Sequence, residues 1–211
     1  MHIFQKFTCG LGYTSPFEFL ADGQENLNYE YAYSDYVLDD SGKARVLDYI
    51  NTQTLFIGDS GDLNHADFLI AFSFGDGKVV NQLLANVVEN IHVSIPTLPL
   101  CLQVEVASHV SNSPCVAIED DFYQTTSDVA KKAKRIMQRS KVVVVAQAWH
   151  AKRCVATCKE IGLDVVAVRV VNKFSFNDPQ PWVRNPINWV IKESHRGTGD
   201  GFDISEQYHL V

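Results

Sequence analysis

The run Val142-Val143-Val144-Val145-Ala146 is the feature that most restricts the fold of this chain. Consecutive apolar and mostly β-branched residues predict a strand that is buried on both faces, as in a parallel sheet. Residues 165–171 predict a second strand of this kind, and residues 151–161 between the two predict a helix that Gly162 ends. A strand–helix–strand order favours parallel pairing through a right-handed crossover.

The same alternation extends upstream. Further strands are predicted at residues 68–72, 98–106 and 115–118, and further helices at 79–91, 126–139 and 186–194. We therefore predict an α/β fold over residues 67–211, a Rossmann-like, doubly wound domain whose mainly parallel sheet has about five strands. The Gly-rich tail from Gly197 is expected to be partly mobile.

Residues 1–66 show no comparable pattern. The first 36 residues are rich in Gly, Asn, Tyr and Phe without a sustained period, although a helix is expected to begin near Asp39. We predict an irregular N-terminal extension packed on the core. This extension contains ten acidic and three basic residues, so it carries the whole formal charge of −7. Its acidic and aromatic character fits a surface for a protein partner, which is one of the hypotheses weighed below.

Composition excludes several classes of protein. The acidic charge argues against general nucleic-acid binding. No apolar stretch approaches the roughly 18 residues of a membrane span, and the first residues do not resemble a signal peptide, so we expect a cytoplasmic protein. The five cysteines form no CxxC pair, which predicts neither a disulfide framework nor a metal site. Cys154 and Cys158 are expected to be buried thiols.

Polar residues at the ends of the predicted strands are the candidates for a site, because ligands of open α/β sheets bind beyond the carboxyl ends of the strands. Gly75-Asp76-Gly77 follows the first strand and fits either a close approach to a phosphate or a simple turn. Gln103 and Glu105 alternate along the next predicted strand, so both should face one side. Glu119-Asp120-Asp121 fits acid–base chemistry, a metal ligand set or a solvated loop.

His150 and Arg153 form the sharpest pair. They are three residues apart near the start of a predicted helix, where exposed N–H groups favour an anion. The pair fits an anion pocket or, equally, a surface His beside a salt-bridged Arg. Residues 131–159 contain nine bases and no acid, which could attract an anion or form a solvated helix face.

These residues resemble a known family. The segment from residue 142 to Gly162 is similar to the motif of the YdcF/SanA/ElyC-type bacterial family. In this motif an apolar strand is followed by an aromatic residue, a histidine (His150), two further residues and an arginine (Arg153), and then by a helix that ends before a glycine. Glu119 matches the acid that follows the third strand of that family. The family's next element is matched by Thr126, Asp128 and Ala130. The chain departs from the pattern where Thr125, Val129, Ala146-Gln147 and Gln103-Val104-Glu105 stand.

The resemblance implies a Rossmann-like fold of the soluble YdcF-type branch, which has been associated with S-adenosylmethionine. Our main hypothesis is a protein that binds a small molecule containing a nucleotide or phosphate. Arg153 would hold the anion, His150 would act as donor or general acid, and Glu119 as base or ribose partner. The remaining expected contacts are Gly75, Asp76, Gly77, Gln103, Glu105, Thr126 and Asp128.

Other functions remain open at this stage. A phosphoester or glycosyl-phosphate hydrolase linked to envelope metabolism would use the acids at 119–121. A non-catalytic interaction module would use residues 1–66 to bind its partner. A methyltransferase that uses S-adenosylmethionine ranks low, because Gly75-Asp76-Gly77 lacks the fuller glycine loop of such enzymes. Whether the protein is an enzyme is thus left open by the sequence.

Overall fold

The computed structural model describes residues 3–12, 29, 36–120 and 124–210. The chain divides into two compact units, which we call the helical unit (residues 1–55 and 173–211) and the sheet unit (residues 56–172). The sequence analysis instead divided the chain between residues 66 and 67. In the structure the sheet unit begins at Phe56, and the residues after Asn172 belong to the helical unit.

The sheet unit is an α/β structure built on six strands in the order β1-β6-β5-β2-β3-β4. All neighbouring pairs are parallel except β1 and β6, which are antiparallel. The predicted Rossmann-like, mainly parallel sheet is therefore confirmed. The strands are β1 Ser60–Gly61, β2 Phe68–Ala71, β3 Leu100–Gln103, β4 Val116–Ile118, β5 Lys141–Gln147 and β6 Asp164–Val171.

Strand β1 lies in the segment that was predicted to be an irregular extension. Ser60 and Gly61 pair with β6, and the Asp59 carboxylate accepts a hydrogen bond of 2.8 Å from the Val170 N–H. Gly61 has a φ of +73°, and a Cβ there would lie 2.0 Å from the carbonyl oxygen of Val166. Glycine at position 61 is thus what allows the close approach of the two backbones.

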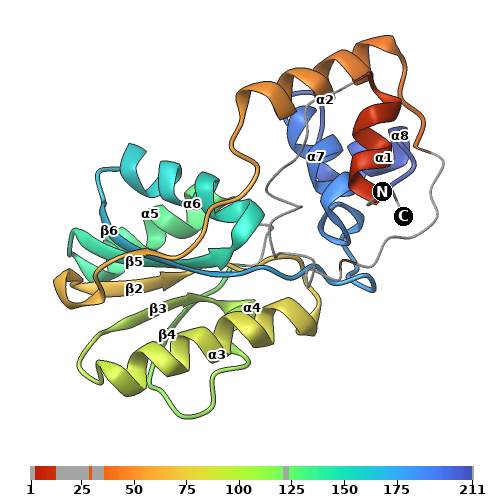
Figure 1. The fold of residues 1–211 in the computed structure, drawn as a ribbon. Helices are drawn as coiled ribbons and strands as arrows, with labels where there is room; N and C mark the ends of the chain where they lie inside the picture. Colours follow the sequence, from red (N-terminus) through yellow and green to blue (C-terminus); the bar gives the residue numbers. More distant parts are fainter. Residues whose placement is uncertain (1–2, 13–28, 30–35, 121–123, 211) are drawn as a thin grey trace. The chain divides into compact units, whose positions relative to one another are not determined.

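Helices cover both faces of the sheet. Figure 1 shows α3 and α4 on one face and α5 and α6 on the other. Every side chain of β2 is completely buried, as are those of Val142 to Ala146 in β5, which confirms the strand buried on both faces. The helices of this unit are α3 Lys78–Ser94, α4 Val104–Ala107, α5 Thr126–Met137 and α6 Ala148–Glu160, with a 3-10 turn, η2, at Leu63–His65.

The helical unit is organised around α7, which contacts α1, α2 and α8. Trp189 and Ile191 of α7 are buried, and the predicted helix over 186–194 is confirmed. The elements are α1 Ile3–Gly10, α2 Asp40–Thr52, a 3-10 turn η3 at Pro181–Val183, α7 Pro186–Ser194 and α8 Gly201–Gln207.

Two of these helices were missed by the sequence analysis. Helix α1 lies in the extension predicted to be irregular, and it buries Phe4 and Thr8, which are one helical turn apart. Helix α8 lies in the tail that was expected to be partly mobile. Its N-terminus is held by reciprocal hydrogen bonds between Asp200 and Asp203, a capping box in which acids replace the usual Ser and Glu.

Within the described ranges, no helix has both the length and the apolar character needed to cross a membrane. Helix α3, with 17 residues, is the longest of them. It carries polar residues throughout, among them Asn81, Glu89 and His92.

Candidate functional site

The strand order reverses between β2 and β5. From β2 the sheet continues through β3 and β4 in one direction, and through β5 and β6 in the other. In open α/β sheets, ligands bind beyond the carboxyl ends of the strands at such a reversal. The segments to inspect are therefore residues 72–77 after β2 and residues 148–153 after β5.

Asn81 holds the loop that follows β2. Its side-chain Oδ1 accepts a hydrogen bond of 3.1 Å from the Phe74 N–H, and its Nδ2 donates to the carbonyl oxygens of Gly75 and Gly77 at 3.0 Å each. Asn81 is 1% exposed. The loop also needs Gly75, whose φ of +72° lies in the left-handed region.

The sequence analysis missed Asn81. It lies on the face of α3 that also buries Leu84, Ala85 and Val88, so a polar residue at an apolar position was the available signal. Residues 75–77 lead from β2 to α3, and the N-cap residue of α3, Gly77, has no side chain to cap the helix.

Gln103, at the end of β3, joins the neighbouring strand to the same loop. Its Oε1 accepts a hydrogen bond of 3.0 Å from the Ser73 N–H. The prediction that Gln103 and Glu105 alternate along one strand is wrong, because β3 ends at Gln103 and α4 begins at the next residue. The helical turn directs Val106 into the core, where it is completely buried.

Glu105 lies in α4, which directly follows the carboxyl end of β3. Its Oε2 atom is buried and has no hydrogen-bond partner among the described residues. A buried carboxylate oxygen without a donor is unfavourable, so this atom is available to a donor from a ligand or from water.

His150 brings three segments together. Its Nε2 lies 3.1 Å from Thr126 Oγ1 at the start of α5, within hydrogen-bond distance. Its ring centroid lies 6.3 Å from that of Phe72 and 6.1 Å from that of Phe74, both of which follow β2. His150 is 6% exposed. It is therefore enclosed at the reversal of strand order and does not lie on the open surface.

The start of α6 explains this position. The helix begins at Ala148, three residues before the predicted start, because Gln147 Oε1 accepts from the Trp149 N–H at 2.6 Å and from the His150 N–H at 3.1 Å. This cap places His150 in the first turn and the half-buried Arg153 one turn later. The predicted location of this pair near a helix N-terminus is thus confirmed.

Helix α5 begins at Thr126, as predicted. Thr125, and neither Thr126 nor Ser127, is the N-cap residue. Asp128 completes a capping box, and the hydrogen bonds from the Thr125 hydroxyl and N–H lower the pKa of the Asp128 carboxyl. Asp128 Oδ2 is therefore used by the helix cap, whereas the Thr126 hydroxyl lies against His150.

The acids after β4 lie elsewhere. Strand β4 is at the edge of the sheet, with β3 between it and β2. Glu119 is exposed, and its carboxylate has no hydrogen-bond or ion-pair partner in the described part of the chain. Asp120 pairs with Lys132, whose ammonium also donates to the Glu119 carbonyl oxygen at 3.1 Å. The structure does not bring Glu119 to His150, and Asp121 lies outside the described residues.

The two cysteines of α6 belong to the core of the sheet unit. Cys154 and Cys158 are buried on α6, as predicted, and burial raises the pKa of the Cys158 thiol to about 12. No group of three or more His, Cys, Asp or Glu side chains that could hold a metal ion occurs among the residues that the structure describes.

Comparisons of the chain with protein-family models, with curated proteins and with solved structures found no match. Function must therefore be argued from the site itself.

Proposed function

We propose that the sheet unit binds a small molecule containing a nucleotide or a phosphate, at the carboxyl ends of β2 and β5. The observation that carries this proposal is the enclosed position of His150 at the reversal of strand order, against Thr126 and against the two aromatic rings that follow β2. A titratable group held there by three segments is a typical feature of a binding site.

The surrounding groups suit an anionic ligand with hydroxyl groups. Arg153 would pair with the phosphate, and His150 would donate a hydrogen bond or act as a general acid. The glycine loop at residues 75–77 and the N-terminus of α3 allow a phosphate to approach the backbone closely. For a ribose hydroxyl, the buried Oε2 of Glu105 is a better acceptor than Glu119, which is exposed at the sheet edge.

The resemblance to the YdcF/SanA/ElyC-type family supports the same location. His150 and Arg153 are its motif residues here, and Thr126 belongs to its second element. S-adenosylmethionine is accordingly a candidate ligand alongside nucleotides. The five cysteines form no disulfide with one another, which suits a reducing compartment, and together with the resemblance this leads us to include a cytoplasmic bacterial protein in the proposal.

The alternatives rest on the sequence alone. A phosphoester or glycosyl-phosphate hydrolase needs a group that activates water or attacks phosphorus, and Glu119 and Asp120 lie at the sheet edge away from the strand reversal. An interaction module that uses residues 1–66 would depend on a segment that is described only in part. We assign no reaction.

Thermal unfolding with and without ligand tests the proposal. The probes are ADP, S-adenosylmethionine and glucose 6-phosphate, and each variant is compared with its own ligand-free state. A ligand at about 100 times its Kd should stabilise the native state by roughly 2.7 kcal/mol. We expect His150→Gln and Arg153→Met to lose most of this stabilisation.

Two matched variants serve as controls. His65→Gln changes an exposed histidine that precedes β2, and Arg135→Met changes an exposed arginine of α5. Both should retain the full ligand effect. The proposal fails if none of the three probes stabilises the wild-type protein, or if the His150 and Arg153 variants respond as the controls do.

A further inference from the structure

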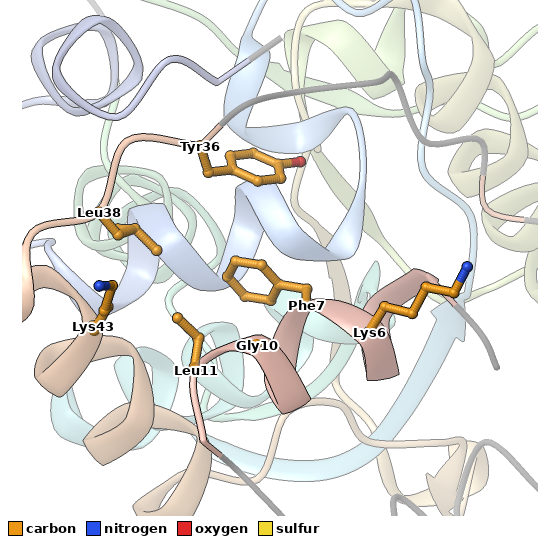
Figure 2. A pocket seen from close by; sticks show the side chains of 7 residues that line it. All are labelled: Lys6, Phe7, Gly10, Leu11, Tyr36, Leu38 and Lys43. Atoms are coloured by element: carbon orange, nitrogen blue, oxygen red, sulfur yellow. The ribbon is translucent and has the colours of Figure 1, made fainter.

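The helical unit contains a pocket of its own. It lies between α1, the segment that leads into α2, and the first turn of α2, and its volume is about 340 Å³. This volume is near the lower end of the range for small-molecule sites, roughly 300–1,000 Å³. The residues that line it are Lys6, Phe7, Gly10, Leu11, Tyr36, Leu38 and Lys43 (Figure 2).

The middle of the pocket is apolar and held in place. Figure 2 shows the Phe7 ring between Tyr36 and Leu11. Phe7 and Tyr36 meet edge to face with centroids 5.6 Å apart, and the Tyr36 hydroxyl donates a hydrogen bond of 2.7 Å to Asn188 Oδ1. Because Tyr36 is anchored to α7, it forms a fixed wall against which a flat apolar group can pack.

The ends of the pocket are cationic. Lys6 and Lys43 lie at its opposite ends (Figure 2), and none of the seven lining residues is acidic. Lys43 Nζ is 3.5 Å from Asp40 Oδ1, an exposed contact that holds it only weakly. The Lys6 ammonium has no hydrogen-bond or ion-pair partner in the described ranges. Of the two cations, Lys6 is the one left for a ligand.

We propose that this pocket binds a small carboxylate with a flat apolar body. The apolar body would pack on Phe7, Leu11 and Tyr36, and the carboxylate would pair with Lys6. An uncharged ligand would lack the ion pair with Lys6, an exposed residue, and should bind more weakly. The proposal does not depend on the nucleotide site, because the two sets of residues lie in different units.

Gly10 offers a way to block the pocket without straining the chain. It is the last residue of α1 and lines the pocket, and a Cβ added to it would meet no atom within 4 Å. A larger side chain at position 10 can therefore be added without a clash at its Cβ, and it would occupy space in the pocket that Gly10 lines. Gly58 of the sheet unit, where an added Cβ also meets nothing within 4 Å, provides the matched control.

Calorimetric titration with naphthalene-2-carboxylate and with its uncharged carboxamide tests the proposal on the full chain. We expect saturable binding of the carboxylate and about three- to tenfold weaker binding of the carboxamide, because both this change and Lys6→Met remove the same ion pair. Lys6→Met should weaken carboxylate binding about three- to tenfold, the range between an exposed and a partly buried ion pair. Lys131→Met, which removes an exposed lysine of α5, should leave it unchanged.

The blocking variants give the second arm. Gly10→Phe should abolish carboxylate binding, whereas Gly58→Phe should not alter it, and circular dichroism should show that both variants are folded. The proposal is overturned if the carboxylate does not bind the wild-type protein, if the carboxamide binds as tightly, or if Gly10→Phe binds like the wild type. Loss of ADP or S-adenosylmethionine binding in the sheet unit would leave these outcomes unaffected.

Discussion

The two units bury polar side chains in different ways. In the sheet unit, Asn81, Gln147 and His150 are buried close to the carboxyl ends of β2 and β5, while the strands themselves supply an apolar core. In the helical unit, buried polar groups are spread through the packing around α7, among them Asn185, Asn188 and His195. Buried polarity therefore marks a candidate site in one unit, whereas in the other it is part of what holds the helices together.

Asn185 and Asn188 illustrate the second case. Asn185 Oδ1 caps α7 by accepting from the Asn188 N–H at 2.9 Å. The Asn188 side chain donates to the Pro181 carbonyl oxygen at 2.7 Å and accepts from Tyr36. The Asn185 bond caps α7, and the two bonds of the Asn188 side chain join α7 to η3 and to the segment that precedes α2, so these bonds have a structural explanation.

The largest expected effect tests the apolar core of the sheet unit. Phe68→Ala removes a completely buried ring from β2 and should lower the free energy of unfolding by about 3–5 kcal/mol, because a cavity forms as well as burial being lost. Urea unfolding followed by circular dichroism measures this change. Val93→Ala, at a site 78% exposed, should change it by less than about 0.5 kcal/mol. Equal effects of the two substitutions would contradict the assigned core.

The second prediction tests whether the buried side chain of Asn81 stabilises the loop that follows β2. Asn81→Ala removes three hydrogen bonds and leaves the Phe74 N–H without its acceptor, so we expect a loss of about 2–3 kcal/mol in the free energy of unfolding. Asn86→Ala, an exposed position on the same helix, is the control. The substitution should also reduce ligand binding at the proposed nucleotide site. A stable Asn81 variant with unchanged binding would remove Asn81 from the site.

The third prediction separates two adjacent threonines. Thr125→Ala removes the N-cap of α5 and should cost about 1 kcal/mol of stability. Thr126→Val keeps the cap but removes the hydroxyl that faces His150, so it should shift the NMR signals of the His150 imidazole. Thr125→Ala should leave those signals nearly unchanged. The roles are reversed if the Thr125 variant moves the His150 signals more strongly.

Some features of the fold and of the candidate site could be predicted from the sequence, and others could not. The parallel strands were predicted because each is a local run of apolar residues, such as Val142 to Val145, and the helix at residues 186–194 was predicted from its Pro and its apolar pattern. His150 and Arg153 were placed correctly because both lie in one helix next to one strand. In each case the information lies within a short stretch of chain.

The failures involve contacts between distant residues. The pairing of Gly61 with Ala167 is not visible in either segment alone. The hydrogen bond from the Ser73 N–H to the Gln103 side chain joins residues thirty positions apart. The contact between Thr126 and His150 likewise requires that α5 and α6 pack together. From the sequence, the candidate site could therefore be predicted only as a set of residues at the ends of strands. The structure shows which of these residues lie close together.

The smallest predicted effect concerns pH and the helical unit. His195, at the end of α7, is completely buried, and its Nδ1 lies 2.8 Å from the Ile191 carbonyl oxygen. Burial lowers the pKa of His195 below its ordinary value of 6.5; Arg45 lowers it further, while the hydrogen bond with Ile191 and the charge of Asp39 oppose the shift.

Because the unfolded chain takes up this proton more readily than the native protein, the native protein should lose stability as the pH falls below about 6.5. Urea unfolding at pH 7 and pH 5 measures the loss, and His195→Gln should reduce it, whereas His65→Gln should not. If His195→Gln leaves the pH dependence of stability unchanged, then packing in the helical unit does not keep His195 neutral. His195 would then have to gain a partner or solvent on protonation, and the contrast with the enclosed His150 of the sheet unit would weaken.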